Sequence, residues 1–383
     1  MAYQIKCFDK IAKCGLDALG EKYSFTDDIA QADVALVRSS SLHEANAGEK
    51  LFAVARAGAG VNNIPVDKFA EKGIVVFNTP GANANAVKEL VIAALLLASR
   101  DIIDGVNWVK TIESDISKTV EKGKKAFAGK EIAGKKLGVI GLGAIGVLVA
   151  NSAISLGMTV YGYDVSLSIE HALALKNNVV AVKSLDEMFA ECDYITVHVP
   201  LLDSTKYLFN ADAFAKMKDG VSIINFSRDL LVNDDDMRAA LASGKVHRYV
   251  TDFPNEKVRA MAGVIVVPHL GASTTESEDN CAVMAVTELM AYVSTGSIKN
   301  SVNFPELDAG SVGEGYRIAV LHKNVPNMIG QFTALLGKKG INIVNMANKS
   351  KGNNAYTVID TETDPAGIAA ELSAIENVYR VRT

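Results

Sequence analysis

The chain has 383 residues, of which 49% are hydrophobic, with 39 basic against 44 acidic side chains and a net charge of -5. This length predicts two or three packed domains, at roughly 100–200 residues per domain. The mildly acidic balance lacks the basic excess of nucleic-acid binders, so we expect no nucleic-acid partner. The longest apolar run, residues 90–99, is too short to cross a bilayer, and the N-terminus shows no apolar signal segment. We therefore expect a cytoplasmic protein without membrane contact.

Four cysteines are present: Cys7, Cys14, Cys192 and Cys281. No pair has the Cys-x-x-Cys spacing of zinc and redox motifs, so reduced thiols are the favoured interpretation and a redox or metal site is the alternative. We expect no bound metal.

The first hundred residues alternate short apolar runs with segments of helical period. Strands are predicted at Val34–Val37, Phe52–Ala55 and Ile74–Phe77, an alternation typical of parallel βαβ units. A helix rich in Ala and Leu, without Gly or Pro, is predicted over Ala84–Ala98; it is apolar over most of its surface and should be buried. Residues 111–136 are lysine-rich and predict a surface helix followed by a loop.

The lysine-rich segment ends at Lys136. A strand is predicted over residues 137–140, followed by a glycine-rich turn and a helix that ends near Leu156. Further strands of this domain are predicted at Thr159–Tyr163, Val179–Ala181, Tyr194–Val197, Ser222–Asn225, Tyr249–Asp252 and Val264–Val267. This order predicts a doubly wound α/β domain that binds a nucleotide.

A long helix is predicted over Glu276–Thr295, and a linker with Pro305 follows it. The remaining predicted elements are strand Arg317–His322, helix Met328–Lys339, strands Ile341–Ala347 and Ala355–Ile359, helix Ala366–Ala374 and strand Val378–Arg382. Their order, βαββαβ, is that of a ferredoxin-like unit. Such a unit is small for a catalytic domain and typical of a regulatory one.

The glycine-rich turn fits the binding of a dinucleotide. Gly141 permits the tight turn, Gly143 lets the backbone approach a pyrophosphate, and Gly146 allows the helix to pack closely on the strand. Ala144 and Ile145 begin the helix, whose free N–H groups and positive dipole end favour phosphate.

Asp164 ends the strand that follows this helix. An acid at this place accepts hydrogen bonds from the ribose hydroxyls and repels the 2′-phosphate of NADP. The sequence therefore predicts NAD as the cofactor. Ser166 and Ser168, which would tolerate a phosphate, leave NADP as the alternative.

Three side chains suited to hydride-transfer chemistry follow successive strands: Arg228, Glu256 and His269. Ligands of an open α/β sheet bind beyond the carboxyl ends of its strands, so we expect the three at one crevice. His269 can remove the proton of a secondary alcohol, and Glu256 can orient it and raise its pKa. Arg228 can bind a carboxylate through two hydrogen bonds. A histidine after a strand is more often structural, and His198 is expected to pack or to line the cofactor cleft.

These residues carry a resemblance to a known family. Gly141–Gly146, Val197–Leu201, Asn225–Arg228 and Pro268–Gly271 are similar, in this order, to motifs of the D-2-hydroxyacid dehydrogenases, over about residues 35–305. The resemblance implies a flavodoxin-like substrate-binding domain, residues 1–97 and 275–305, that is split by a Rossmann-type NAD-binding domain, residues 98–274.

The resemblance also implies roles. His269 would be the acid/base, Glu256 its partner and Arg228 the ligand of the substrate carboxylate. Further contacts to the cofactor are expected from His198, Pro200, Ser227, Asp252, His269 and Gly271. The chain departs from the family pattern in two places: Asp229 and Asn233 replace a Gly and an Asp, and the interval from Glu256 to His269 is short.

Arg38 and Arg56 follow two strands of the first domain, and Ser39 lies beside the first of them. The turn Gly58-Ala59-Gly60 can cradle a carboxylate with its N–H groups. The two arginines suit a substrate with a second anionic group; surface salt bridges are the alternative. The resemblance implies that they contact the phosphate of 3-phospho-D-glycerate, and that a loop ending at Asn83 closes on the substrate.

Residues 314–383 resemble an ACT domain. His322, Asn324 and Asn342 match in type the residues that hold L-serine between two paired domains of this kind. The resemblance implies L-serine as an effector and a homodimer or homotetramer; a purely structural dimerisation domain is the alternative.

Together these features predict oxidation of 3-phospho-D-glycerate to 3-phosphohydroxypyruvate. Another D-2-hydroxy acid, or reduction of 2-oxoglutarate at the same site, is the enzymatic alternative. A non-catalytic, NAD-sensing protein similar to a corepressor is the alternative from another class. The complete set of Arg228, Glu256 and His269 argues against it.

Overall fold

Five short parallel strands near the N-terminus form the first sheet of the computed structural model, which describes residues 2–313, 315–365 and 367–383. The strands are β1 (Tyr3–Cys7), β2 (Tyr23–Phe25), β3 (Val34–Val37), β4 (Ala53–Arg56) and β5 (Val75–Phe77). Their order, β2-β1-β3-β4-β5, is the flavodoxin-like order that we expected. The three predicted strands are present; no prediction covered β1 and β2, which are mostly half-buried and lack a long apolar run.

Three α-helices accompany this sheet: α1 (Lys13–Leu16), α2 (Val66–Glu71) and the long α11 (Thr275–Thr295). The buried side of α11, from Cys281 to Tyr292, shares one hydrophobic core with β1, β3, β4 and β5. A methyl group built on Gly15 of α1 would lie 2.7 Å from the backbone of Ala282, so the two helices approach closely. The chain thus returns to its first domain through α11.

A seven-stranded parallel sheet forms the second domain. Its strands are β6 (Lys136–Ile140), β7 (Thr159–Tyr163), β8 (Val180–Ala181), β9 (Tyr194–Val197), β10 (Val221–Asn225), β11 (Val246–Thr251) and β12 (Val264–Val266). The order β12-β11-β10-β9-β6-β7-β8 confirms the predicted doubly wound arrangement. The strand order reverses at β6, and at such a point ligands bind beyond the carboxyl ends of the strands.

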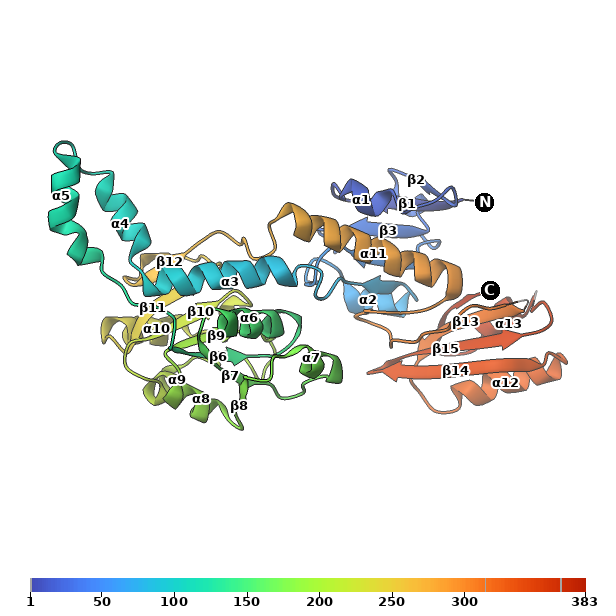
Figure 1. Ribbon diagram of the computed structural model, residues 1–383. Helices are drawn as coiled ribbons and strands as arrows, with labels where there is room; N and C mark the ends of the chain where they lie inside the picture. The colour runs from blue at the N-terminus through green and yellow to red at the C-terminus, as the bar shows by residue number, and fades with distance from the viewer. Residues whose placement is uncertain (1, 314, 366) are drawn as a thin grey trace. The chain divides into compact units, whose positions relative to one another are not determined.

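Helices cover this sheet, among them α3 (Ala84–Ser99), α6 (Ala144–Ser155), α7 (Ile169–Ala174), α8 (Leu185–Glu191), α9 (Ala211–Lys216) and α10 (Asp234–Ala242). The predicted Ala- and Leu-rich helix is α3, which lies over this sheet (Figure 1). Its Val87, Val91 and Leu95 belong to the same core as β6. Its small side chains allow it to pack closely against α6.

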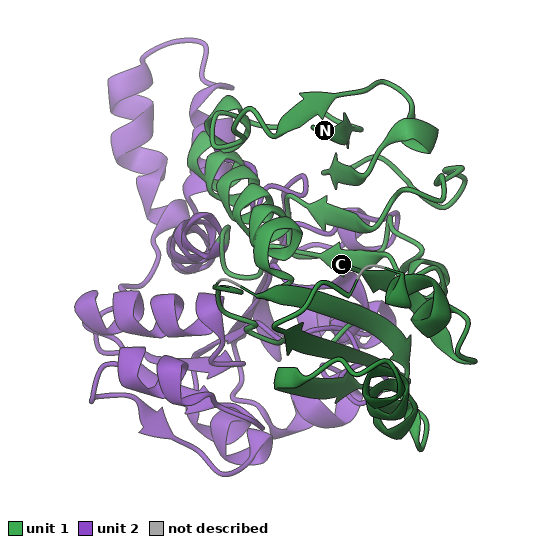
Figure 2. Ribbon diagram, turned by 90° about the vertical axis from the view of Figure 1, so that its right-hand side faces the viewer, with its two compact units in different colours: residues 1–83, 275–383 green, residues 84–274 purple. Residues whose placement is uncertain are grey.

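The polypeptide divides into two compact units, drawn in green and purple in Figure 2: residues 1–83 with 275–383, and residues 84–274. The boundary that we expected near residue 98 falls inside α3, which lies wholly in the second unit. The C-terminal domain, expected to be separate, belongs to the first unit.

Two helices, α4 (Ile102–Val109) and α5 (Ile116–Gly123), form an arm that extends away from the seven-stranded sheet (Figure 1). Trp108 of α4 packs on Phe127 with ring centroids 5.1 Å apart, and this contact closes the hairpin. No residue of either helix is buried. The surface helix and the loop predicted within residues 111–136 are thus present as α5 and the segment that follows it. No prediction covered α4, whose apolar side chains do not face a core.

The C-terminal domain is a four-stranded antiparallel sheet with two helices. Its elements are β13 (Tyr316–Lys323), α12 (Met328–Lys338), β14 (Ile343–Lys351), β15 (Asn354–Thr361), α13 (Ile368–Ser373) and β16 (Val378–Arg382). The sheet order β14-β15-β13-β16 confirms the predicted βαββαβ unit. The predicted start of the domain, residue 314, and of its second helix, Ala366, lie outside the described residues.

Both faces of this sheet are covered. Ile318 and Val320 pack on α12 and α13, whereas Leu321 and Tyr356 belong to the core of the first domain. The guanidinium of Arg382 lies 4.1 Å from the ring centroid of Phe52, a cation–π contact across the same junction. The C-terminal domain is thus docked on the five-stranded domain rather than tethered by a free linker.

Over the described ranges, no helix has the length and apolar content needed to cross a membrane. The same residues contain no cluster of three His, Cys, Asp or Glu side chains able to hold a metal ion.

Candidate functional site

The turn between β6 and α6 has the geometry of a dinucleotide loop. Gly141 adopts φ +89°, a left-handed conformation that favours glycine. A methyl group on Gly146 would lie 1.8 Å from the carbonyl oxygen of Gly141, so helix and turn touch there. A methyl group on Gly143 would meet no atom within 4 Å, so this glycine leaves open space before the N-terminus of α6, which begins at Ala144 and Ile145. That space suits a pyrophosphate group.

Asp164 follows β7 and fixes the same turn. Its Oδ2 accepts a hydrogen bond from the N–H of Leu142 at 2.7 Å, and its Oδ1 accepts one from the N–H of Ser166 at 2.7 Å. Each carboxylate oxygen can accept more than one bond, so Asp164 retains acceptor capacity for ribose hydroxyls. The structure therefore brings the predicted acid beside the glycine turn.

His198 lies directly after β9, against the glycine turn. A side chain on Gly141 would strike the carbonyl group of His198 at 2.6 Å. The ring Nε2 is 3.0 Å from the hydroxyl of Thr196, and burial lowers the pKa of His198 to about 3, so the ring is neutral at ordinary pH. Its Nδ1 is enclosed without a hydrogen-bond partner. Burial thus disfavours the cationic form of His198, which makes it a poorer proton acceptor than an exposed histidine such as His269.

Two further expected cofactor contacts lie at neighbouring strand ends. The hydroxyl of Ser227 donates a hydrogen bond to the carbonyl oxygen of Val197 at 2.7 Å, which joins the loops after β9 and β10. Pro200 is exposed on the loop after β9. These two loops frame the carboxyl ends of the central strands.

Asp252 is fully buried at the end of β11. Its Oδ2 accepts a hydrogen bond from the N–H of Gly271 at 3.0 Å, and its Oδ1 is buried without a partner. Burial raises the pKa of Asp252, and the charge of His269 acts in the opposite direction. An enclosed acceptor without a partner at this edge of the sheet suits a polar donor of a bound cofactor.

The residues present therefore fit NAD: an open glycine turn before a helix N-terminus, an acid with spare acceptors, and enclosed polar atoms of His198 and Asp252. Gly141, Gly143, Gly146 and Asp164 would hold the pyrophosphate and ribose, and the enclosed polar atoms would face the remainder.

Arg228 begins the loop after β10. Its NH1 donates a hydrogen bond to the carbonyl oxygen of Ser227 at 2.6 Å, and its own carbonyl oxygen accepts one from the amide of Asn225 at 2.8 Å. The two departures in this loop are accommodated locally. Asp229 does not need a positive φ, and Asn233 caps α10 by accepting hydrogen bonds from the N–H groups of Asp235 and Asp236. Asn and Asp are equally good caps, so the loop shape does not require the family residues.

His269 follows β12 and is exposed. Its ring makes an edge-to-face contact with Phe253, with 5.0 Å between the ring centroids. Glu256, its expected partner, is exposed as well, and none of the ion pairs among the described residues joins the two. The charge of His269 favours the ionised form of the Asp252 carboxyl group, against the effect of burial on its pKa. The role of Glu256 stays a prediction.

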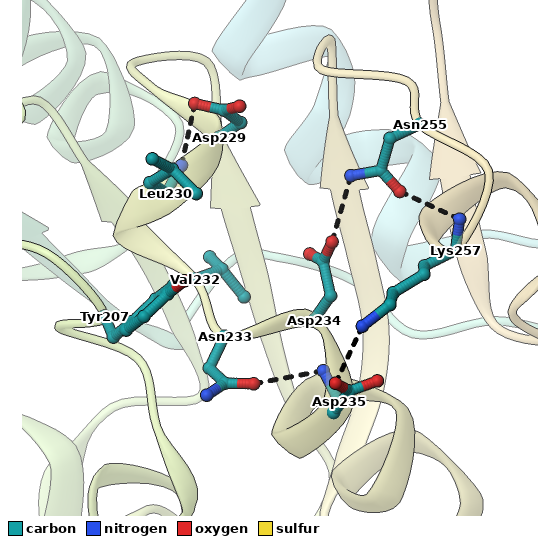
Figure 3. Close-up of a pocket in the computed structure, with 9 residues that line it drawn as sticks. All are labelled: Tyr207, Asp229, Leu230, Val232, Asn233, Asp234, Asp235, Asn255 and Lys257. Carbon is teal, nitrogen blue, oxygen red and sulfur yellow. Dashed lines mark hydrogen bonds and ion pairs between the residues drawn. The ribbon is translucent and has the colours of Figure 1, made fainter.

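The short loop that carries Glu256 is fixed on both sides. The amide of Asn255 donates to Asp234 at 2.9 Å, and the ammonium of Lys257 donates to Asp235 at 2.7 Å (Figure 3). Both aspartates belong to the first turn of α10, and a pocket of about 170 Å³ lies among these side chains. The loops that carry Glu256 and Arg228 are therefore connected through α10.

The five-stranded domain brings Arg38 and Arg56 together at the ends of β3 and β4. The Nε of Arg56 donates a hydrogen bond to the carbonyl oxygen of Arg38 at 3.0 Å. A methyl group on Gly58 would lie 2.6 Å from NH1 of Arg56, so that guanidinium covers the glycine-rich turn. Arg38 also forms an ion pair with Glu278 at 2.7 Å. The salt-bridge alternative is thus realised for Arg38 in this structure.

Sequence reasoning missed Asp9, which organises this corner. Its carboxylate accepts hydrogen bonds from the N–H groups of Arg38, Ser39 and Ser40, and these bonds lower its pKa. The signal, an acid just after the unpredicted β1, is visible only once that strand is placed beside β3.

Two of the expected effector residues have partners within the C-terminal domain. His322 is buried, with Nε2 2.8 Å from the hydroxyl of Thr357 and Nδ1 2.9 Å from the carbonyl oxygen of Lys323. The amide of Asn324 donates to the carbonyl oxygen of Gly352 at 3.1 Å. Asn342 is exposed just before β14, an edge strand.

Comparisons with known proteins identify the family of this chain. The model of the "D-isomer specific 2-hydroxyacid dehydrogenase, NAD binding domain" matches residues 92–271. A D-3-phosphoglycerate dehydrogenase of Haemophilus influenzae is 34% identical over 348 residues, which cover 88% of this chain and 82% of that protein. A hydroxypyruvate reductase of Thermotoga maritima is 36% identical over 286 residues, 70% of this chain and 87% of that protein.

Among solved structures, NAD⁺-bound 3-phosphoglycerate dehydrogenase of Entamoeba histolytica is similar, with a TM-score of 0.62 and 26% sequence identity. The match covers 80% of this chain and 100% of that chain. The chain belongs to the D-isomer specific 2-hydroxyacid dehydrogenase family. It is an NAD-dependent oxidoreductase that acts on small 2-hydroxy acids, as predicted, and NAD is its cofactor. Its relatives are named for two substrates, 3-phosphoglycerate and hydroxypyruvate.

Proposed function

We propose that the protein oxidises 3-phospho-D-glycerate to 3-phosphohydroxypyruvate, the first step of L-serine biosynthesis. The observation that carries the proposal is the pair of guanidinium groups at Arg38 and Arg56, on adjacent strand ends beside the turn Gly58-Ala59-Gly60. Two arginines beside a turn of backbone N–H groups suit a substrate with two anionic groups. Relatives named D-3-phosphoglycerate dehydrogenase, 34% and 33% identical over most of this chain, support the same substrate.

His269 is assigned as the acid/base of the reaction. Oxidation of the substrate removes a hydride from its C2 carbon and a proton from its hydroxyl. NAD, when bound, accepts the hydride. His269 takes the proton, and it is suited to this because it is exposed at a strand end, whereas His198 is held neutral by burial.

Arg228 and Glu256 support this step. Arg228 is assigned to the substrate carboxylate, which it would hold so that the C2 carbon keeps one orientation. Glu256 is assigned to stabilise the cationic form of His269. In this structure the two side chains are not paired, so the assignment requires Glu256 to approach His269 when the substrate is bound.

The phosphate is assigned to Arg38 and Arg56. Arg38 must then exchange its ion pair with Glu278 for the substrate or share its guanidinium between both anions. The loop from Asn78 to Asn83 is assigned to close over the substrate, as expected from the family.

L-serine is proposed as an effector that binds the C-terminal domain at His322, Asn324 and Asn342. The edge position of β14 supports pairing of two such domains, since an exposed strand offers unpaired backbone groups to a second copy. His322 would have to release Thr357 or Lys323 to contact the ligand.

A homodimer or homotetramer is proposed on a separate observation. The arm of α4 and α5 exposes Ile102, Ile103, Val106, Val109 and Ile116, each at least 39% exposed. Apolar side chains gathered on a projecting hairpin are typical of a surface that binds another subunit.

Use of another 2-hydroxy acid is the second candidate function, favoured by the 36% identity to a hydroxypyruvate reductase. A panel of substrates separates the two. Reduced-cofactor formation with 3-phospho-D-glycerate should exceed that with D-glycerate and D-lactate at equal concentrations. Comparable or higher turnover of the unphosphorylated acids would refute the proposal, and reduction of 2-oxoglutarate or hydroxypyruvate alone would replace it.

A further inference from the structure

Residues 300–303, here called the strap, lie along the edge of β5 and pair with it. The N–H of Val302 donates to the carbonyl oxygen of Val76 at 2.9 Å. The side chain of Asn303 accepts from the N–H of Val76 and donates to the carbonyl oxygen of Ile74, both at 2.9 Å. Ser301 and Asn303 are buried. The strap thus completes the edge of the sheet, where the backbone groups of β5 would otherwise lack partners.

The strap also contacts the substrate turn through one residue. The N–H of Asn78 donates to the carbonyl oxygen of Asn300 at 3.3 Å, and the side-chain amide of Asn78 donates to the carbonyl oxygen of Ala59 at 2.5 Å. Ala59 is the middle residue of the turn Gly58-Ala59-Gly60. Asn78 is thus hydrogen-bonded both to the turn and to the strap.

The C-terminal domain holds the strap from the other side. The ammonium of Lys351, at the end of β14, donates to the carbonyl oxygen of Ser301 at 2.7 Å. The amide of Asn354, at the start of β15, donates to the carbonyl oxygen of Asn303 at 3.0 Å. The hairpin of β14 and β15 thus binds the strap through two hydrogen bonds.

Asn300 is fixed independently of this hairpin. It adopts φ +55°, and its amide donates to Glu288 at 2.6 Å. The end of the strap next to Asn78 thus has an anchor of its own in α11, in addition to the contacts with the hairpin.

We propose that Lys351 and Asn354 are positioning residues for the substrate: through the strap and Asn78 they position the turn Gly58-Ala59-Gly60, which is proposed to bind an anionic group of the substrate. This inference rests on the proposed function of that turn. It gives the docked C-terminal domain a direct, hydrogen-bonded route to the substrate site, so that a change in the hairpin alters substrate affinity without touching the NAD site.

The test compares variants of the full-length protein by steady-state kinetics with 3-phospho-D-glycerate and NAD. Lys351→Met with Asn354→Ala should raise the KM for the 2-hydroxy acid about fivefold or more, the lower range of coupling between sites. The kcat at saturation and the Kd for NAD should change little, and the Tm should fall only slightly, because Lys351 is exposed and Asn354 is half-buried. Lys351→Arg alone, which keeps a hydrogen-bond donor at this position, should keep the KM of the wild type.

Two control variants separate positioning from docking. Arg380→Met removes hydrogen bonds to the carbonyl oxygens of Glu49 and Lys72, which join the same two domains without the strap. Lys349→Met removes an equal charge from the same strand. Both should keep the wild-type KM, whereas a merely structural effect of the hairpin would appear in Arg380→Met as well.

Asn78→Ala distinguishes failure of this inference from failure of the proposed function. It should raise the KM, and the hairpin variant should add nothing in its background. If Asn78→Ala raises the KM but the hairpin variant does not, or if the two effects add, the positioning role of Lys351 and Asn354 is refuted. An unchanged KM in Asn78→Ala would overturn the substrate role of the turn and this inference with it.

Discussion

Gly143 and Gly146 stand in the same turn, and the structure assigns them opposite tasks. A methyl group on Gly146 would lie 1.8 Å from the carbonyl oxygen of Gly141, and the obstacle is backbone rather than a side chain that can rotate. Gly146→Ala must therefore push α6 away from the turn by more than an ångström. Overpacking of this kind costs about 1–3 kcal/mol, so we expect a lower Tm and loss of NAD binding together.

Gly143→Ala should separate these two effects. Its backbone, at φ -76° and ψ -162°, is open to any residue, and no atom lies within 4 Å of the added methyl group. The fold should keep its Tm. The methyl group would occupy the space in which the backbone is expected to meet the pyrophosphate, so the Kd for NAD should rise roughly tenfold or more, equivalent to about 1.4 kcal/mol.

Thermal unfolding followed by circular dichroism and titration with NAD measure the two quantities for each variant. If Gly143→Ala binds NAD as tightly as the wild type, the backbone at this position does not approach the cofactor. If Gly146→Ala keeps the wild-type Tm, the close contact between helix and turn is not a structural constraint.

The remaining predictions concern charge. Asp164→Ala should narrow the preference for NAD over NADP, measured as a ratio of kcat/KM values; equal use of both cofactors by the wild type would contradict the role of Asp164. Arg38→Ala or Arg56→Ala should raise the KM for 3-phospho-D-glycerate about 10–150-fold and leave D-glycerate almost unaffected, whereas equal losses would exclude a phosphate role. Burial raises the pKa of Glu288 to about 7 from 4.5, so its stabilising contribution, on the order of 3 kcal/mol, is present below about pH 4.5 and lost as pH rises through 7. Glu288→Gln should flatten the dependence of Tm on pH between these values, and an unaltered dependence would show that Glu288 does not titrate there. L-serine should inhibit the wild type, and Asn342→Ala should abolish the inhibition while basal activity is retained; calorimetry that shows no serine binding would reject this.

The parts of the fold and site that could be predicted from sequence are those set by local chemistry. The tasks of Gly141 and Gly146 follow from backbone geometry, and a buried parallel strand such as β3 is a continuous apolar run. Arg228 and His269 could be assigned to strand ends because parallel strands share one carboxyl edge. Each of these inferences needs only neighbouring residues.

The unpredicted features depend on segments far apart in the chain. Asp9 and Glu278 reach Arg38 only after β1 and α11 are placed beside β3. The docking of the C-terminal sheet buries Tyr356, which alone does not reveal what it packs against. The side chain of Asn303 forms hydrogen bonds to the backbone at β5 that a neighbouring strand would otherwise form. No sequence pattern indicates such a contact.

The most direct test of the central claim is the kcat of His269→Ala with 3-phospho-D-glycerate and NAD. We expect the kcat to fall roughly 10²–10⁴-fold, the range for loss of a general acid/base, while NAD binding persists because the glycine turn is untouched. Near-normal turnover in this variant would contradict the assignment of His269 and the mechanism built on it.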